Sequence, residues 1–171
     1  MERLLPVRAF LFVVLLPGTV VGYLPFRLLR ASGSLHVPKA GPASLAAATL
    51  TLLGITVLLA CVWQFLASGH GTLAPLDPPS RLVVSGLYRY TRNPMYSGVV
   101  LTLVGEAWLF RSLLVLEYTG LTFALFHLFV VLYEERTLRS RFGREYAAYR
   151  AAVPRWGFTV RPFTRARDGS A

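Results

Sequence analysis

Apolar residues in this chain are gathered into long runs instead of being spread along its length. Four stretches are nearly free of charged side chains, residues 9–26, 43–67, 97–110 and 112–133. A bilayer core of about 30 Å is crossed by a helix of about 20 apolar residues. The pattern therefore predicts an all-α integral membrane protein with about four transmembrane helices.

The last two apolar runs are predicted to form a helical hairpin. As one helix, the segment from Met95 to Tyr133 would extend about 58 Å, which is about two crossings of the bilayer. We place the turn near Arg111–Ser112, although neither Pro nor Gly marks it. In the first run Pro17 and Pro25 predict kinks, which membrane helices tolerate.

The segments around the hairpin are polar. Residues 68–95 are rich in Pro and Gly, which excludes a continuous helix there. Residues 134–152 carry a stripe of apolar and aromatic residues at helical spacing, namely Leu138, Phe142, Tyr146 and Tyr149. We expect this C-terminal amphipathic helix to lie on the membrane surface or against the 68–95 loop.

The pattern divides the chain into three parts. Residues 1–67 form the N-terminal transmembrane helices, and residues 68–156 form a core of loop, hairpin and amphipathic helix. Residues 157–171 are expected to be a flexible tail.

Charge adds an orientation to this picture. The net charge is +10, yet only 15% of residues are charged, against about 25% in soluble domains. Of the basic residues, 14 fall on the side of the N-terminus, the 68–95 loop and the tail, and four on the other side. The positive-inside rule places the richer side in the cytoplasm. The composition is typical of a GC-rich genome, so we expect a multi-pass protein of a bacterial inner membrane.

The same arginines argue against one class of partner. A basic chain can bind nucleic acid, but here the arginines flank apolar runs, where anionic lipid attracts them. We therefore expect a lipid bilayer and no nucleic acid as partner. One cysteine, Cys61, and three dispersed histidines make no metal site.

Two ionisable residues fall within the predicted membrane spans. Glu106 lies in the third span and His127 in the fourth, and the two could meet across the hairpin. Such residues are candidates for function by default. They either form a structural hydrogen bond between helices or line a tunnel for a small molecule.

The hairpin also brings two polar segments together. Arg92 and Tyr96 precede its first helix, while Glu134 and Glu135 follow its second, and the two ends of a hairpin are neighbours. The helix starting near Met95 offers free N–H groups and a positive dipole end to an anion. These residues form either a ligand-binding cleft or ordinary interfacial anchoring by charged and aromatic side chains.

Three motifs around this hairpin carry a resemblance to a known family. Residues 85–98 read SGLYRYTRNPMYSG, residues 134–138 read EERTL, and residues 142–149 read FGREYAAY. Together with the closing VPRW at 153–156, they resemble the superfamily of isoprenylcysteine carboxyl methyltransferases and phospholipid methyltransferases. The resemblance covers about residues 70–156. Asn93 stands where many members have His, so no histidine role is carried over to that position.

The resemblance implies an enzyme that uses S-adenosyl-L-methionine in a cytoplasmic pocket, with a lipophilic small-molecule acceptor entering from the bilayer. Arg92 and Glu135 are the implied catalytic residues. Either Arg92 or the helix end can take the cofactor's carboxylate, and either glutamate its ammonium or ribose. The implied cofactor-binding residues are Gly86, Leu87, Tyr88, Arg92, Asn93, Pro94, Tyr96, Glu134, Glu135, Tyr146 and Tyr149.

Several alternatives remain open at this point. The acceptor could be a carboxylate, a thiol or an amine, and an amine would need Glu135 as a base. A membrane reductase of the sterol-reductase-like type, which uses NADPH, has a similar C-terminal signature. A non-enzymatic membrane subunit is disfavoured by the intact Arg92, Tyr96 and glutamate pair.

Overall fold

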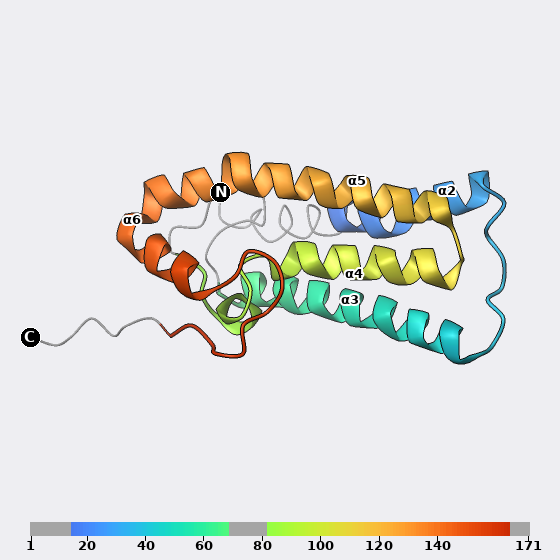
Figure 1. Ribbon diagram of the computed structural model, residues 1–171, viewed down its shortest axis with the longest axis horizontal. Coiled ribbons are helices and arrows are strands. Elements are labelled where there is room, and N and C mark those ends of the chain that lie inside the picture. The colour runs from blue at the N-terminus through green and yellow to red at the C-terminus, as the bar shows by residue number, and fades with distance from the viewer. Residues whose placement is uncertain (1–14, 69–81, 165–171) are drawn as a thin grey trace, which may run out of the picture.

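The computed structural model describes residues 15–68 and 82–164, and all regular structure in these residues is helical. The long helices lie lengthwise beside one another (Figure 1). In chain order the elements are the π-helical turn η2 (Thr19–Tyr23), α2 (Leu24–Ala31), α3 (Pro42–Ser68), the 3-10 turn η3 (Gly86–Arg89), α4 (Pro94–Leu109), α5 (Leu113–Phe129), the π-helical turn η4 (Val130–Glu134) and α6 (Glu135–Ala152).

Two of the described helices are long and apolar enough to cross a bilayer. They are Pro42–Gln64 in α3 and the continuous helix Leu113–Ala152, of which a bilayer core takes up about 20 residues. Only 28% and 22% of their most apolar windows are buried, unlike the core helix of a soluble protein. The predicted second run, residues 43–67, forms one helix of sufficient length and hydropathy for a crossing. α4 has 16 residues and extends about 24 Å, so four crossings remain a prediction.

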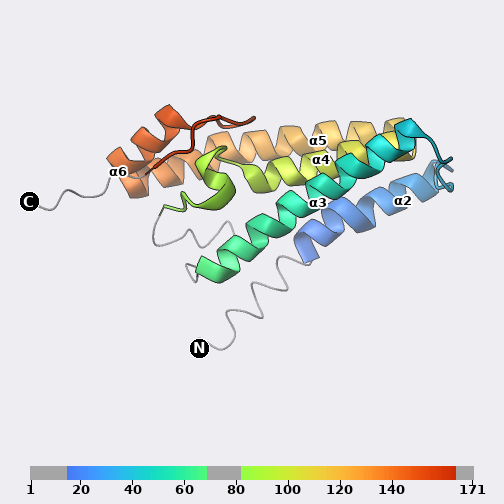
Figure 2. The same cartoon turned by 90° about the horizontal axis from the view of Figure 1, so that it is seen from below.

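Helices α3 and α4 pack with their backbones in close approach (Figure 2). A Cβ atom added at Gly98 would lie 2.9 Å from the backbone nitrogen of Leu58, and one added at Gly105 would lie 2.6 Å from α3 backbone. A Cβ at Gly54 would collide with the backbone of Thr102. Small residues permit this contact, as in other membrane helix pairs.

The first helical run is modified rather than broken at its prolines. The π-helical turn η2 lies between Pro17 and Pro25, and Pro25 falls in the first turn of α2. Proline has no N–H to donate inside a helix, and the π-helical turn directly before it lets the helix continue past Pro25. The hydroxyl of Tyr118 on α5 donates to the carbonyl of Val20, 3.0 Å away, and so ties this run to the hairpin.

The hairpin turn lies where it was predicted. α4 ends at Leu109 and α5 begins at Leu113. Arg111 adopts a positive φ of 50°, and the Ser112 hydroxyl caps α5 by accepting from the N–H of Val115. Arg111 adopts the left-handed backbone conformation that glycine usually supplies in such turns, so no Gly marks this turn.

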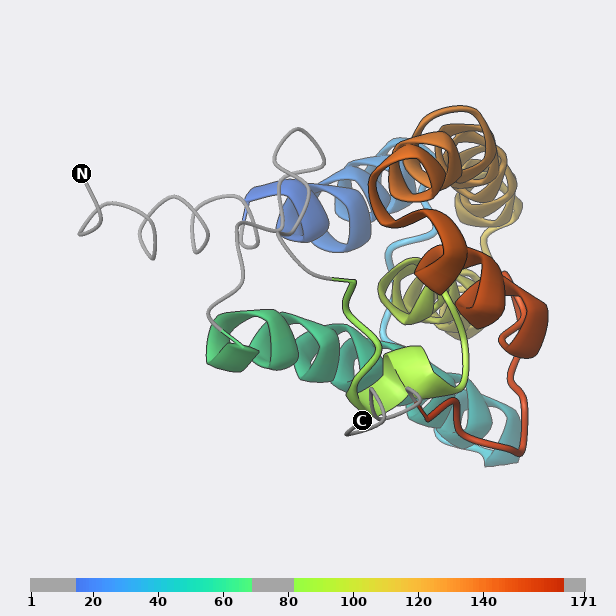
Figure 3. The same cartoon turned by 90° about the vertical axis from the view of Figure 1, so that its left-hand side faces the viewer.

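The C-terminal helix is not a separate element. α5 continues through η4 into α6, and the chain changes direction only at Gly143, where φ is 46° and ψ is −117°. The part after Gly143 turns back, so that Tyr146 and Tyr149 pack against Leu82 of the 68–95 loop. This end of the molecule faces the viewer in Figure 3.

Replacing Gly143 by alanine should therefore destabilise the fold. A side chain in this backbone region costs about 1–3 kcal/mol, although no neighbouring atom would collide with it. Thermal unfolding in detergent should show a transition lowered by several degrees. Ser140→Ala, at an exposed site on the same helix, should leave it nearly unchanged. Equal transitions for the two variants would contradict the role given to Gly143.

Candidate active site

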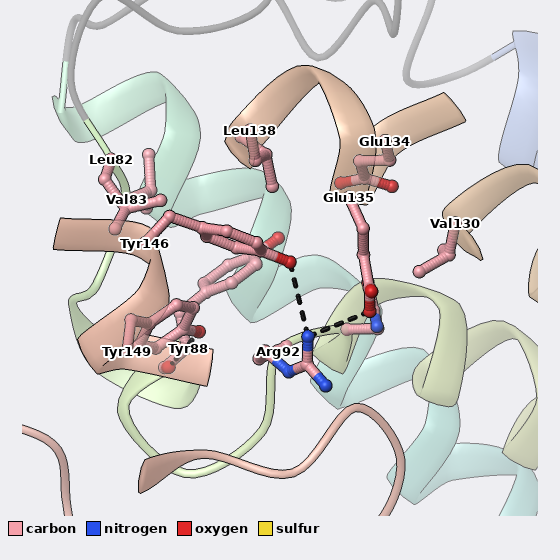
Figure 4. A pocket seen from close by; sticks show the side chains of 11 residues that line it. Leu82, Val83, Tyr88, Arg92, Val130, Glu134, Glu135, Leu138, Tyr146 and Tyr149 are labelled. Carbon is pink, nitrogen blue, oxygen red and sulfur yellow. Dashed lines mark hydrogen bonds and ion pairs between the residues drawn. The ribbon is translucent and has the colours of Figure 1, made fainter. Parts of the chain in front are cut away.

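One pocket lies at the end of the molecule away from the hairpin turn. It encloses about 90 Å³ between the loop that precedes α4, the η4 turn and α6 (Figure 4). Its walls combine charged, aromatic and aliphatic side chains, namely Leu82, Val83, Tyr88, Arg92, Asn93, Val130, Glu134, Glu135, Leu138, Tyr146 and Tyr149.

Glu135 is bound by two arginines. Arg92 Nη1 lies 2.8 Å from Glu135 Oε1, and Arg155 donates from Nε to Oε1 at 2.6 Å and from Nη2 to Oε2 at 3.0 Å. Glu135 is only 5% exposed, and burial alone would raise its pKa. The hydrogen bond from Arg155 and the charges of both arginines more than offset this, so the pKa of Glu135 lies below its usual value.

Arg92 has more hydrogen-bond donors than the described residues satisfy. Besides Glu135 it reaches the hydroxyl of Tyr146, which lies 3.2 Å from Nη1 (Figure 4). Its side chain is 10% exposed, and its Nε is buried with no hydrogen-bond partner among the described residues. A buried donor without an acceptor is costly in a folded protein. Such a group is typical of a site that a ligand completes.

Glu134 has a different environment from its neighbour. It accepts a hydrogen bond from the Tyr96 hydroxyl, 3.3 Å away, and forms no ion pair within residues 15–68 and 82–164. Burial raises the pKa of Glu134, the Tyr96 hydrogen bond partly offsets the effect, and the charge of Glu135 adds to it. Both glutamates adjoin the π-helical turn η4, and such turns are frequent at functional sites.

Tyrosines form the wall of the pocket on the side of α6. The rings of Tyr146 and Tyr149 lie 6.3 Å apart. Tyr149 donates its hydroxyl to the carbonyl of Tyr88 at 2.6 Å, which joins α6 to the η3 turn. Burial raises the pKa of Tyr88 well above its usual value, so this phenol stays neutral. Neutral aromatic rings can pack on a flat heterocycle or near a cation.

Residues 153–163, which we call the C-terminal strap, run along the loop that precedes α4. The backbone of Arg92 donates to Pro154, and the Asn93 side chain donates to the Arg155 carbonyl at 3.1 Å. Further along, the N–H groups of Thr159 and Phe163 donate to the carbonyls of Tyr90 and Arg89, each at 2.9 Å. Thr159 and Phe163 of the predicted flexible tail are thus hydrogen-bonded to the loop, and residues 165–171 lie outside the described residues.

The structure brings most of the predicted site residues together. Seven line the pocket, namely Tyr88, Arg92, Asn93, Glu134, Glu135, Tyr146 and Tyr149. Tyr96 reaches it through its bond to Glu134. Gly86, Leu87 and Pro94 do not line it. Pro94 begins α4, and Gly86 supplies a positive φ of 53° to the η3 turn.

The structure also adds residues and corrects one expectation. Val130 and Arg155 were not among the predicted site residues, although Arg155 stands in the VPRW motif. Glu106 and His127 do not meet. His127 Nδ1 instead accepts from the indole N–H of Trp156 at 3.0 Å, and Glu106 Oε2 is buried without a partner in the described segments. The physical reason is distance, because Glu106 lies near the hairpin turn and His127 near the opposite end of α5.

In the described residues, the fold is helical, and its pocket, which holds Arg92 and two glutamates, lies at the ends of apolar helices. Residues 43–145, more than half of the chain, match the model of the phospholipid methyltransferase family. The chain belongs to this family, which confirms the predicted superfamily and indicates methyltransferase activity in a membrane. No curated protein and no solved structure matches the chain.

The extent of the match differs from that of the sequence resemblance. It begins at residue 43 and so includes α3, which the resemblance over residues 70–156 left out. It ends at residue 145, before Tyr146, Tyr149 and the C-terminal strap. It gives no support to the reductase alternative.

Proposed function

We propose that this protein is an S-adenosyl-L-methionine-dependent methyltransferase that acts on a lipophilic acceptor in the membrane. One observation carries the proposal. In a chain of a methyltransferase family, one pocket holds Arg92, whose Nε is buried and partnerless, and Glu134, a half-buried carboxylate that forms no ion pair with any described residue.

These two groups fit the amino-acid end of the cofactor, which carries one carboxylate and one ammonium. Arg92 would hold the carboxylate, and Glu134 the ammonium, by charge-assisted hydrogen bonds. Tyr146 and Tyr149 offer ring faces to the adenine or the sulfonium. Ligand pockets usually enclose about 300–1,000 Å³, so a pocket of about 90 Å³ must widen to take the cofactor.

When bound, the cofactor supplies an electrophilic methyl group. The residues of this chain bind and orient the reactants, and such alignment can lower a barrier by about 7–11 kcal/mol. Glu135 is poorly suited to act as a base, because two arginines pair with it and lower its pKa. Glu134 is bound to the cofactor's ammonium in this arrangement, so an amine acceptor would have to react as the neutral amine.

The position of the pocket supports a lipophilic acceptor. Glu134 and Glu135 continue the same helix as the apolar α5, whose exposed residues include Leu121, Leu125 and Leu128. An acceptor dissolved in the bilayer can reach the pocket along this helix while its polar end meets the cytoplasmic side. Its reacting group is a carboxylate, a thiol or an amine.

Calorimetric binding of S-adenosylhomocysteine to the purified protein in detergent tests the proposal. We expect micromolar binding, weakened at least tenfold by Glu134→Gln, because a charge-assisted hydrogen bond is worth about 1.5–3 kcal/mol. Glu117→Gln, on the exposed face of α5, is the matched control and should bind as the parent does. A folded protein that binds NADPH but not S-adenosylhomocysteine would refute the proposal.

A further inference from the structure

The C-terminal strap contributes a second arginine to the pocket's ion-pair network. Arg155 makes two of the three hydrogen bonds that Glu135 accepts from arginine, one to each carboxylate oxygen. This two-point geometry is the strongest form of arginine–carboxylate pairing. Arg92, by contrast, meets Glu135 through a single nitrogen.

The strap places Arg155 by contacts on both sides of it. Its carbonyl accepts from the Asn93 side chain, and the next residue, Trp156, donates to His127 on α5. The ring of Trp156 also lies 5.1 Å from that of Phe123. Arg155 is therefore held between the loop that precedes α4 and the apolar helix α5.

The ion pairs of Glu135 indicate how Arg155 affects Arg92. Both arginines pair with Glu135, and Arg155 donates two of the three hydrogen bonds that Glu135 accepts from them. Without Arg155, Arg92 would be the only ion-pair partner of Glu135 among the described residues, and a buried carboxylate with too few donors is costly. The buried, partnerless Nε of Arg92 would then be turned to Glu135.

We propose that Arg155 is a positioning residue, which binds Glu135 so that Arg92 keeps its free donors for the anionic end of the ligand. This inference rests on the proposed function, in which that anionic end is the cofactor's carboxylate. Arg155 acts through Glu135 and Arg92, and it does so from a segment that lies beyond the family match.

Two ligands separate this role from a general effect on folding. One is S-adenosylhomocysteine, and the other is its decarboxylated analogue, in which hydrogen replaces the carboxylate. Binding of both is measured by calorimetry for the parent, Arg155→Met, Arg155→Lys and the control Arg161→Met, whose side chain is exposed on the same strap. Thermal unfolding of each variant is recorded alongside.

We expect Arg155→Met to weaken S-adenosylhomocysteine about tenfold and the decarboxylated analogue less than twofold. Arg155→Lys should recover part of the loss, because it restores the charge but not the two-point geometry. Equal weakening of both ligands, or no weakening, would overturn the role of Arg155 while leaving the proposed function intact. Failure of the folded parent to bind either ligand would overturn both.

Discussion

Replacing Arg92 by methionine should abolish binding of S-adenosylhomocysteine and methyl transfer. Arg92 hydrogen-bonds both Glu135 and Tyr146, and its buried Nε has no partner among the described residues. In a complex, truncating one partner of a buried, hydrogen-bonded charge pair costs about 2–5 kcal/mol of binding free energy. We therefore expect an affinity loss of about 100-fold, measured by calorimetry. Incorporation of the labelled methyl of S-adenosyl-L-methionine into extractable membrane lipid should fall to background.

Two further variants make this result specific. Arg92→Lys keeps the charge but loses the planar fork, so it should bind more weakly than the parent and better than Arg92→Met. Arg139→Met, at an exposed position of α6, should leave both measurements unchanged. Full activity of a folded Arg92→Met protein would show that the site has been assigned to the wrong residues.

Replacing Gly54 by valine should prevent the fold from forming. The first added carbon would meet the backbone of Thr102 and the carbonyl of Gly98, neither of which can move aside as a flexible side chain does. Overpacking of a core costs about 1–3 kcal/mol where side chains can adjust, and more where they cannot. We expect little monodisperse protein after extraction into detergent, as judged by size-exclusion chromatography.

Gly120 provides a matched control for this experiment. It lies on α5, and a Cβ added there would meet nothing within 4 Å. Gly120→Val should therefore give a normal yield and an unfolding temperature close to that of the parent. A normal yield from Gly54→Val would mean that α3 and α4 are not in close backbone contact.

Much of this fold is encoded in local features of the sequence. Helix α3 spans Pro42–Ser68, against a predicted 43–67, because one apolar run is bounded by helix-breaking residues at both ends. The position of the hairpin turn follows from the length of the apolar segment from Met95 to Tyr133, which is about two bilayer crossings. Convergence of Arg92 with Glu134 and Glu135 follows from the hairpin, since helix ends that flank a turnback are neighbours.

Other features have no comparable signal in the sequence. The polar Glu134-Glu135 pair suggested the start of a separate helix, whereas the structure continues one helix through a π-helical turn. Such a turn depends on one extra residue per helical turn, which apolar spacing does not reveal. The bend at Gly143 was likewise hidden inside a motif.

The different surroundings of Glu134 and Glu135 depend on a residue from further along the chain, Arg155, which pairs only with Glu135. Arg155 reaches Glu135 only because the break at Gly143 and the strap bring it back to the pocket. From the sequence alone the two carboxylates are equivalent neighbours. Their distinct surroundings are a property of the tertiary structure.

The unbroken helix from Leu113 through η4 connects the apolar segment to the pocket, so a change in the tilt of this helix would move the pocket residues on it. A transmembrane helix adapts to a thicker or thinner bilayer mainly by changing its tilt. Glu134 and Glu135 lie at the pocket end of this helix, while Arg92 belongs to the loop before α4 and Arg155 to the C-terminal strap. We therefore predict that the length of the lipid chains affects the alignment of the ion pairs, and that turnover varies with acyl chain length in reconstituted vesicles.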